Sequence, residues 1–337
     1  MSEREVRSPS DRSPSDRSPS DVDRRQHLAT LHSAWATPLN VVAAVVGEVT
    51  KAPIVDSRRI VEGEQNEVYD VTLDQAPSVI VRISHTGSEA HDREAWVLGQ
   101  CAVRGIRAPR VHAVRRVEVC SEFRSVMVTE KLPGVRLADL DPDDVDVRRV
   151  LEEVGAWLKQ LHTIPVRGLG NLDGSGVGTF ETLDEWLANV TTQARLFEDA
   201  GRSVGLEPTT IRGWLREILD SLRGASPRMT MSHNDLLAVH VLVHDGRLSG
   251  IIDFGVAAAE PAANDFAKWS FREGARFPVE WIQAGYGDPG LFEPPNDRSY
   301  RALWLLHGLW YLRHYYVTGF PAGVRAGRDR LLSRPGR

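Results

Sequence analysis

Two stretches of the chain are rich in polar residues that can carry chemistry: Ser232-His233-Asn234-Asp235-Leu236-Leu237-Ala238-Val239-His240 and, further along, Ile251-Ile252-Asp253-Phe254-Gly255. The segment between them is predicted to be a β-hairpin, because its turn, His244-Asp245-Gly246-Arg247, contains the Asp-Gly pair typical of tight turns. A hairpin brings the outer ends of its two strands together. Asp235, just before the hairpin, and Asp253, at its end, are therefore expected to lie close to each other.

Two converging carboxylates carry like charges, and these repel each other strongly where water is excluded. A bound cation relieves that repulsion. Mg²⁺ is commonly held by one or two carboxylates together with nucleotide phosphates. An imidazole from the same stretch is expected beside the carboxylates, so the pattern favours acid–base chemistry next to a divalent metal.

The order of these residues resembles the catalytic loop and metal loop of the protein-kinase-like superfamily. The finer match is to the aminoglycoside phosphotransferase and choline kinase-like family, whose signature ends in a Pro-x-x-Asp motif. Here that motif is Pro261-Ala262-Ala263-Asn264-Asp265, one residue longer than the commonest form. A protein kinase would carry a long activation segment ending in Ala-Pro-Glu, which this chain lacks. The resemblance covers about residues 50–320 and implies a small-molecule kinase, with Asp235 as catalytic base and Asp253 as metal ligand.

The same resemblance implies four cofactor-binding residues in the N-terminal half. Gly63 lies in a segment like the family's nucleotide-covering hairpin, although a single turn glycine is usually structural. Arg82 takes the place of the phosphate-pairing Lys and can hold phosphate oxygens in a bidentate fork. Glu94 resembles the helix glutamate that pairs with this base; taken alone it would be interpreted as a solvated helix residue. Glu130 lies in a segment like the interlobe hinge, whose backbone binds the nucleotide base.

Two positions depart from the commonest family pattern. His240 stands where most members have a metal-binding Asn, although some drug-phosphorylating branches have His. Neutral imidazole can bind a divalent ion, but it is a softer ligand than Mg²⁺ prefers, so His240 could act through a water. The alternative is a buried, hydrogen-bonded histidine. Asn234 replaces the usual Gly of the signature.

The predicted fold class is α+β, a bilobal protein-kinase-like fold with a small antiparallel-sheet N-lobe and a mostly helical C-lobe. Residues 7–21 are three copies of Arg-Ser-Pro-Ser-Asp, which offer almost no apolar surface to bury, so residues 1–22 are predicted to be a disordered tail. Residues 23–132 are assigned to the nucleotide-binding lobe and residues 133–325 to the helical lobe with the catalytic hairpin and substrate cleft. Residues 326–337 are predicted to be a frayed tail.

Hydrophobic periodicity predicts the individual elements. The expected strands are 54–55, 59–61, 67–73, 78–83, 111–114, 125–130, 239–243 and 248–254. The expected helices are 22–49, 91–103, 146–162, 181–196, 209–222 and 302–317. Within the third helix, the pattern Gly-x-x-Leu-x-x-Leu-His at residues 155–162 is assigned a packing role.

The composition limits the range of partners. The chain has 337 residues and a formal net charge of −5, which argues against a nucleic-acid-binding surface. No apolar run approaches the length needed to span a bilayer, no signal-peptide core is present, and the only two cysteines suit a reducing compartment. A cytoplasmic protein without a nucleic-acid, membrane or obligate protein partner is therefore expected.

Two further groups of residues carry open alternatives. The acidic residues Glu181, Asp184, Glu185, Glu198 and Asp199 are interpreted as a solvated helix face, with recognition of a cationic substrate as the alternative. The aromatic residues of helix 302–317 are interpreted as core, with substrate contact as the alternative for a minority of them.

The expected reaction is transfer of the γ-phosphoryl group of ATP or GTP, with Mg²⁺ as cofactor, to a hydroxyl of a small molecule. The resemblance favours an aminoglycoside- or macrolide-like antibiotic as the acceptor. A metabolic kinase of choline, homoserine or a sugar is the first alternative. A catalytically silent nucleotide-binding pseudokinase is the second, and a metal-dependent hydrolase is the third.

Overall fold

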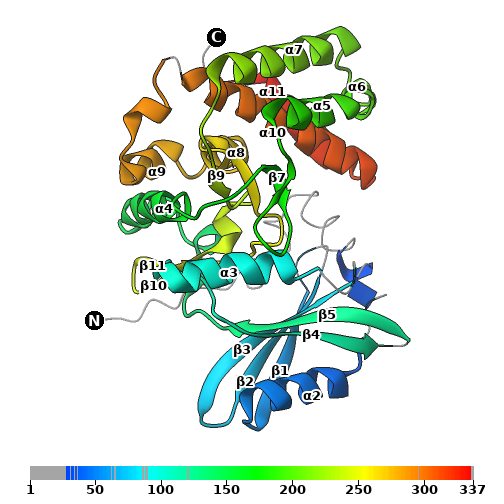
Figure 1. Ribbon diagram of the computed structural model, residues 1–337, viewed down its shortest axis with the longest axis vertical. Helices are drawn as coiled ribbons and strands as arrows, with labels where there is room; N and C mark the ends of the chain where they lie inside the picture. Colours follow the sequence, from blue (N-terminus) through cyan, green and yellow to red (C-terminus); the bar gives the residue numbers. More distant parts are fainter. Residues whose placement is uncertain are drawn as a thin grey trace.

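The computed structural model describes residues 28–334 except positions 31, 34, 36, 62, 64, 65, 86, 88, 89, 120 and 295. The predicted disordered tail, residues 1–22, lies outside this part of the chain. The described residues form two lobes, one built on an antiparallel sheet and one mostly helical (Figure 1). The predicted α+β fold class, with a small antiparallel-sheet lobe and a mostly helical lobe, is therefore confirmed.

The N-lobe contains a five-stranded antiparallel sheet of order β1-β2-β3-β5-β4. Helix α2 packs on one face of this sheet, where Val42 and Val46 contact a core that includes Val71 and Val81. Helix α3 lies between the sheet and the helical lobe (Figure 1). The N-lobe elements, in chain order, are α2 (Leu39–Thr50), β1 (Ile54–Ile60), β2 (Asn66–Leu73), β3 (Ala76–Ser84), α3 (Asp92–Arg104), β4 (Val111–Val119) and β5 (Glu122–Glu130).

The strands of this sheet differ in how regularly buried and exposed residues alternate along them. Tyr69, Val71 and Leu73 alternate with less buried residues along β2, as expected for a strand with one face in the core. In contrast, β1 is one continuous strand where two short ones were predicted. It lies at the sheet edge and pairs only with β2, so its burial pattern is irregular and the apolar alternation is lost.

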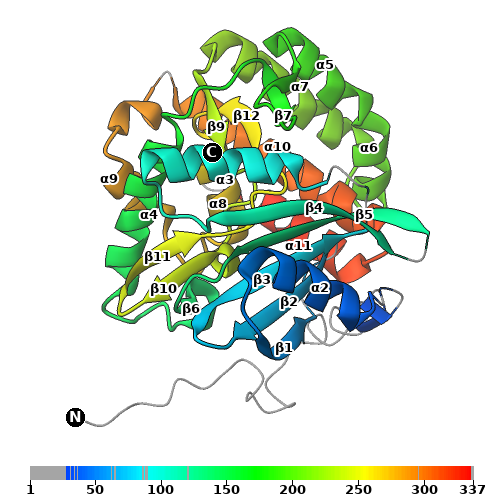
Figure 2. The same ribbon diagram turned by 60° about the horizontal axis from the view of Figure 1, so that its bottom comes forward.

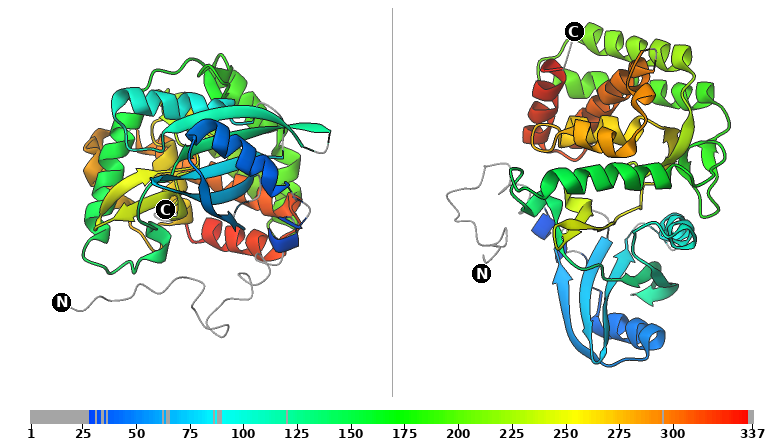
Figure 3. Two further views of the ribbon diagram at one scale, coloured as in Figure 1. Left: turned by 90° about the horizontal axis from the view of Figure 1, so that it is seen from below. Right: turned by 90° about the vertical axis from the view of Figure 1, so that its left-hand side faces the viewer.

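The C-lobe is mostly helical (Figure 3). Its apolar side chains form two clusters, one around α4 and the predicted hairpin and one among the later helices. Its helices are α4 (Val147–Leu161), α5 (Leu183–Thr192), α6 (Ala194–Arg202), α7 (Pro208–Ala225), α8 (Asn264–Arg272), α9 (Val279–Tyr286), α10 (Asp297–Val317) and α11 (Pro321–Leu332), with short 3₁₀ turns η3 (Leu137–Asp139), η4 (Ala238–His240) and η5 (Pro289–Leu291).

The described part of the C-lobe also contains two small β-sheets. One has the order β11-β10-β6, and its strands lie beside α4 in Figure 2. The other has the order β8-β7-β12-β9. Their strands are β6 (Val135–Arg136), β7 (Leu169–Leu172), β8 (Gly178–Phe180), β9 (Met229–Ser232), β10 (Val241–His244), β11 (Arg247–Ile251) and β12 (Ala258–Pro261).

The predicted hairpin is present as β10 and β11. His244 pairs with Arg247, which leaves a two-residue turn in which Asp245 and Gly246 have φ values of 49° and 67°. Two positive φ angles define the turn type that matches the twist of the strands. The strands are shorter than predicted, because η4 precedes β10, and β11 ends at Ile251 so that Asp253 lies in the following loop.

The glycine pattern in α4 has the packing role that was predicted. A Cβ on Gly155 would lie 2.0 Å from the carbonyl oxygen of Ile282, and one on Gly285 would lie 1.8 Å from that of Glu152. The backbones of α4 and α9 therefore approach too closely for any side chain between them. At the end of α4, Nδ1 of His162 forms a 2.9 Å hydrogen bond with the hydroxyl of Tyr286.

Three helical predictions differ from the structure. In place of the single helix predicted over residues 22–49, the described residues are helical at 28–30, at 32–33 and in α2 from Leu39, and Trp35, Thr37 and Pro38 are not helical. Pro38 accounts for the interruption, because a proline disfavours the helical conformation at the residue before it. The helix predicted over residues 181–196 is divided at Gln193 into α5 and α6. The C-terminal segment, predicted to fray from residue 326, is helical through Leu332. The reason is that α11 packs on α10: Leu331 is buried, and a Cβ on Gly308 would lie 2.3 Å from the Leu331 side chain. Residues 335–337 lie outside the described part of the chain.

Within the described residues, no helix combines the length and the apolar character needed to cross a membrane.

Candidate functional site

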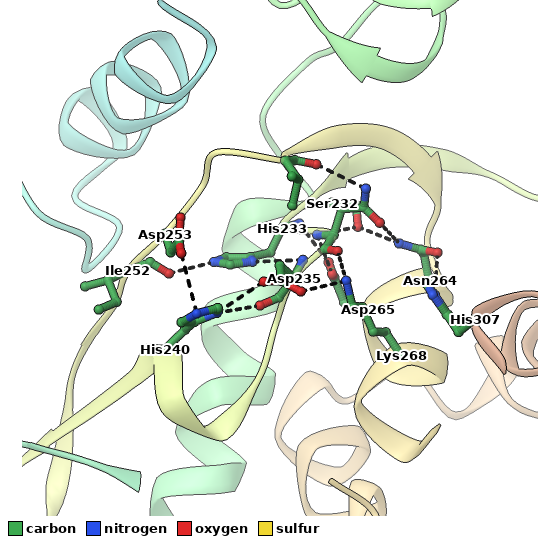
Figure 4. Close-up of polar contacts among 12 residues, drawn as sticks. Ser232, His233, Asp235, His240, Ile252, Asp253, Asn264, Asp265, Lys268 and His307 are labelled. Carbon is green, nitrogen blue, oxygen red and sulfur yellow. Dashed lines mark hydrogen bonds and ion pairs between the residues drawn. The ribbon is translucent and has the colours of Figure 1, made fainter. Parts of the chain in front are cut away.

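The loop after β9 is fixed by one buried carboxylate. Asp265, on α8, accepts hydrogen bonds from the backbone N–H groups of His233 (2.9 Å) and Asn234 (2.8 Å) (Figure 4). Burial raises the pKa of Asp265, and these hydrogen bonds oppose the shift. Asn234 itself has φ of 59°, in the left-handed region that few residues other than glycine adopt. The loop that presents Asp235 is therefore held by α8.

His233 is a structural part of this loop. Its Nε2 donates to the carbonyl oxygen of Ile252 (3.0 Å), and its Nδ1 accepts from the backbone N–H of Asp235 (3.2 Å). Both bonds together require a neutral ring. Burial, assisted by nearby His240, lowers the pKa of His233 to about 4. His233 thus ties the Asp235 loop to the Asp253 loop.

His240 lies between the two carboxylates predicted to carry the chemistry. Its Nδ1 bonds the backbone oxygen of Asp235 at 2.8 Å, and its Nε2 lies 3.5 Å from Oδ2 of Asp253 (Figure 4). Its Nδ1 is also 3.7 Å from Oδ2 of Asp235. The structure therefore brings Asp235, His240 and Asp253 together at one end of the β10–β11 hairpin.

Lys268, on α8, is a site residue that the sequence analysis missed. Its Nζ lies 2.7 Å from Oδ1 of Asp235 and also donates to the backbone oxygen of Asn234. Burial raises the pKa of Asp235, but the charges of Lys268 and His240 more than offset that effect, so the pKa lies below its ordinary value. Lys268 follows Asp265 by three residues, so both lie on one helix face, and this spacing was a readable signal.

A second ion-pair cluster joins the N-lobe to the Asp253 loop. Arg82, on β3, bonds Glu94 on α3 through Nη1 and Oδ1 of Asp253 through Nη2, the latter at 2.9 Å. Glu94 also accepts from the backbone N–H of Phe254 (3.2 Å). Burial disfavours the charge on Arg82, but the two carboxylates outweigh this and raise its pKa. Arg82, Glu94 and Asp253 thus form one connected group across the two lobes.

The guanidinium of Arg82 forms ion pairs with both carboxylates of this group, Glu94 and Asp253. Burial, together with the charge of Asp253, raises the pKa of Glu94, and Arg82 offsets this only in part. Burial also opposes ionisation of Asp253, yet Arg82 and the neighbouring imidazoles hold its pKa well below the ordinary value. Asp253 adopts φ of 70°, a strained conformation for a non-glycine residue. The loop therefore holds an ionised carboxylate in a fixed and unusual orientation.

A buried network of hydrogen bonds extends from the loop after β9 to α10. His307 donates from Nε2 to Oδ1 of Asn264 (3.0 Å), and Asn264 donates to Oγ of Ser232 (3.0 Å) and to Oδ1 of Asn234 (3.2 Å). Burial, with a further contribution from the charge of Lys268, lowers the pKa of His307 to about 3. These bonds connect α10 to the loop that carries Asp235 (Figure 4).

Two predicted site residues lie apart from these clusters. Gly63, in the turn between β1 and β2, has φ of 93°, and its carbonyl oxygen accepts from Nε2 of His32 at 2.9 Å. Glu130 is the last residue of β5, and its side chain accepts from the backbone N–H of Arg110 at 3.3 Å. Both of these contacts lie within the N-lobe and involve none of Asp235, His240 and Asp253.

The donor set between the two lobes suits a divalent cation. Oδ1 of Asp253 is bound to Arg82, whereas Oδ2 faces Nε2 of His240. Nδ1 of His240 donates to the backbone oxygen of Asp235, so the neutral tautomer that binds a metal has its free lone pair on Nε2, on the side of Oδ2. A divalent cation between these two atoms would be bound by both. Among the described residues, no group of three or more His, Cys, Asp or Glu could hold a metal ion, so phosphate and water oxygens would have to complete its coordination.

The acidic residues of α5 and α6 have local partners. Asp184 pairs with Arg223, Glu198 with Arg212, and Asp199 with Arg202. The Glu185 side chain accepts from the backbone N–H of Thr182 and completes the N-terminal cap of α5. These contacts agree with the interpretation of this stretch as a solvated helix face.

A small antiparallel-sheet lobe over a helical lobe, with the loop that carries Asp235 at their junction, is the architecture of the protein-kinase-like fold class. Three solved structures illustrate the similarity. The first is a thermostable mutant of aminoglycoside phosphotransferase APH(4)-Ia in ternary complex with ADP and hygromycin B. It superposes on this chain with a TM-score of 0.70 at 17% sequence identity, and the match covers 87% of this chain and 98% of that chain. Macrolide 2′-phosphotransferase MphH from Brachybacterium faecium has a TM-score of 0.58 at 16% identity, covering 88% and 100%. A putative fructosamine-3-kinase from Haemophilus somnus 129PT has a TM-score of 0.61 at 17% identity, covering 86% and 96%.

The chain belongs to the phosphotransferase enzyme family, whose model matches residues 56–303. The protein is therefore an enzyme, a phosphotransferase that acts on hydroxyl groups of small molecules. A search of curated proteins finds no significant match.

Proposed function

We propose that this protein transfers the γ-phosphoryl group of ATP or GTP to a hydroxyl of a small molecule, at the site formed by Asp235, His240 and Asp253. The observation that carries the proposal is the position of His240, whose two ring nitrogens face the two aspartates. Solved structures of the same fold contain ADP or AMP-PNP together with hygromycin B, which supports a nucleotide and a small-molecule acceptor at this site.

Asp235 is the proposed catalytic base. Lys268 holds Oδ1, while Oδ2 lies 3.7 Å from His240, beyond hydrogen-bond distance, and the side chain keeps 30% of its exposure. Oδ2 can therefore accept the hydrogen bond of an acceptor hydroxyl. As the hydroxyl oxygen forms its bond to the γ-phosphorus, the bond from that phosphorus to the bridging oxygen breaks, the electron pair leaves with the nucleoside diphosphate, and the acceptor proton passes to Asp235.

Asp253 and His240 are the proposed ligands of Mg²⁺. When bound there with the nucleotide, the metal would neutralise charge on the phosphate oxygens. Arg82, fixed by Glu94, is proposed to orient the phosphates, because its guanidinium lies directly beside Asp253. The turn at Gly63 is proposed to cover the phosphates, and the backbone near Glu130 to bind the base.

Lys268 has a proposed electrostatic role. Phosphoryl transfer has a loose transition state, so positioning and charge neutralisation contribute more than proton abstraction. A cation at 2.7 Å keeps Asp235 ionised and aligned before the acceptor arrives. The low pKa of Asp235 is compatible with this, because the proton needs to be taken only late in the reaction.

An aminoglycoside- or macrolide-like antibiotic is the proposed acceptor, with resistance as its consequence and the cytoplasm as its location. The fold is shared with both kinds of drug kinase. It is also shared with a putative fructosamine-3-kinase, so a metabolic acceptor is the second candidate.

A coupled assay of ADP or GDP release tests the proposal across aminoglycosides, macrolides and small alcohols, with mass spectrometry of the acceptor. Drug-dependent release with a phosphate added to the drug supports the antibiotic proposal. Release only with choline, homoserine or a sugar supports the metabolic alternative. Tight nucleotide binding without turnover on any acceptor would refute catalysis and favour a pseudokinase.

A further inference from the structure

The loop that carries Asp253, residues 252–256, lies between β11 and β12 and has no helical or strand structure of its own. Asp253 has φ of 70° there, and such a conformation persists only where the surroundings impose it. Each residue of this Asp253 loop bonds a side chain from outside the loop. The bonds join His233 Nε2 to Ile252 O (3.0 Å), Arg82 Nη2 to Asp253 Oδ1 (2.9 Å), Phe254 N to Glu94 Oε1 (3.2 Å), Arg93 Nη1 to Gly255 O (3.0 Å) and Asn234 Nδ2 to Val256 O (3.1 Å).

Arg93, on α3, bonds this loop and a second segment of the helical lobe at the same time. Its Nη1 donates to the carbonyl oxygen of Gly255, and its Nε donates to that of Leu172, the last residue of β7. The backbone N–H of Leu172 in turn donates to the carbonyl oxygen of Ala257 at 3.4 Å, directly after the loop. One guanidinium therefore fixes α3, the end of β7 and the Asp253 loop relative to one another.

Two adjacent residues of α3 bind the loop, one as acceptor and one as donor. Glu94 accepts from the backbone N–H of Phe254, and Arg93 donates to the carbonyl oxygen of Gly255. Glu94 also pairs with Arg82, whose other nitrogen holds Oδ1 of Asp253. A shift of α3 would therefore disturb this ion pair and the loop together, so the position of α3 determines the orientation of the Asp253 carboxylate.

The turn between β7 and β8 holds the same part of α3. A Cβ on Gly176, which has φ of 79°, would lie 2.1 Å from the ring of Trp96, so this ring packs directly on the backbone of the turn. A Cβ on Gly174 would lie 3.0 Å from Cβ of Asp92. Figures 1 and 3 show this green segment beside α3. Residues on both sides of Arg93 in the sequence are thus packed against the helical lobe, which keeps its guanidinium at the two carbonyl oxygens.

We propose that Arg93 is a positioning residue for the metal ligand: by fixing the carbonyl of Gly255, it keeps Oδ2 of Asp253 on the side of His240, where Mg²⁺ would bind. This inference rests on the proposed function, because it takes Asp253 as a ligand of Mg²⁺. Arg93 acts through the Asp253 loop and does not touch the metal, the nucleotide or the acceptor.

Hydrogen exchange without metal or nucleotide tests the proposed effect on the loop. Arg93→Met keeps most of the apolar stem and removes both donors. The Phe254 amide should exchange about tenfold faster in this variant, because local opening of the loop costs less. Amides of the β4–β5 pair should exchange as in wild type. Arg93→Lys, which can donate to one of the carbonyl oxygens, should give an intermediate rate.

Calorimetric titration of AMP-PNP with and without Mg²⁺ tests the consequence for the metal. In Arg93→Met the Mg²⁺-dependent gain in affinity should fall about 3- to 10-fold, while the affinity without Mg²⁺ stays within about twofold of wild type. Arg276→Met is the matched control. The Arg276 guanidinium also donates to two backbone carbonyl oxygens, those of Ala138 and Leu140, both outside the Asp253 loop. This variant should leave both affinities unchanged.

Trp96→Leu is an independent test if Arg93→Met fails to fold. It removes the ring that packs on Gly176 and leaves every hydrogen bond to the loop chemically possible. The same faster exchange at Phe254 and the same loss of Mg²⁺ dependence are expected. A folded variant with lower thermal stability but wild-type exchange at Phe254 and wild-type Mg²⁺ dependence would overturn the inference. A wild-type protein whose nucleotide affinity does not respond to Mg²⁺ would instead refute the proposed function.

Discussion

Nζ of Lys268 lies 2.7 Å from Oδ1 of Asp235, and α8 thereby supplies a positive charge to the proposed catalytic base. The same helix supplies Asp265, which accepts from the backbone of the loop that carries Asp235. Helix α8 therefore sets both the position and the ionisation of Asp235.

Replacing Lys268 by Met should move the acid limb of the kcat/KM profile to higher pH. Asp235 must be ionised to accept a proton, and Lys268 lowers its pKa. Without that charge the effect of burial is opposed less, so the pKa of Asp235 rises and activity is lost at a higher pH as the solution is acidified. A shift of about one pH unit or more is expected. Lys159→Met is the control, since Lys159, on α4, lies over the ring of Tyr286, on α9, and not beside Asp235. An acid limb that does not move in Lys268→Met would disprove this role.

His240→Asn should change the metal preference of the reaction. Imidazole is a softer ligand than an amide oxygen and favours Mn²⁺ over Mg²⁺ more strongly. The variant should keep Mg²⁺-dependent activity within about tenfold of wild type, while the ratio of Mn²⁺- to Mg²⁺-supported kcat/KM falls. His240→Leu, which has no donor atom, should lose activity about 100-fold or more with either metal. An unchanged metal ratio in His240→Asn would show that His240 does not contact the cation.

Glu260→Gln should make the free energy of unfolding less dependent on pH. Glu260, on β12, is buried, and burial raises its pKa to about 8 from an ordinary value of 4.5. The folded state therefore keeps a proton that the unfolded state loses, and the associated stability is present below pH 4.5 and lost as pH rises toward 8. The loss should be on the order of 2–4 kcal/mol. Denaturant titrations from pH 5 to 8 measure it, with exposed Glu207→Gln as control. Equal pH slopes for wild type and Glu260→Gln would contradict a buried neutral carboxyl.

The fold class and the hairpin were predictable because they depend on local pattern. The Asp245-Gly246 pair specifies a tight turn, and the turn specifies which ends of the strands meet. The break between α5 and α6 was not predictable, because no glycine or proline marks it at Gln193. The ordered C-terminal helix was missed because it depends on contact with α10, which a sequence pattern does not reveal.

Some residues of the candidate site were likewise predictable from the sequence, and others were not. Asp235, His240 and Asp253 stand on either side of one hairpin, so short-range sequence order placed them together. Lys268 could have been found from its spacing after Asp265 on one helix face. A buried cluster around Glu67 on β2, which lies apart from this site, could not have been found, because Thr37, Arg59 and His85 contact Glu67 from three separate segments. Only the folded chain shows that they share one carboxylate.

The central claim is that Asp253 binds the metal–nucleotide complex and Asp235 acts on the acceptor. Calorimetric titration of AMP-PNP with and without Mg²⁺, into wild type, Asp235→Asn and Asp253→Asn, tests this division directly. Asp235→Asn should bind within about threefold of wild type while its kcat falls about 10²- to 10⁴-fold. Asp253→Asn should lose the Mg²⁺-dependent part of the affinity, about tenfold or more. Wild-type affinity and Mg²⁺ dependence in Asp253→Asn would contradict the account.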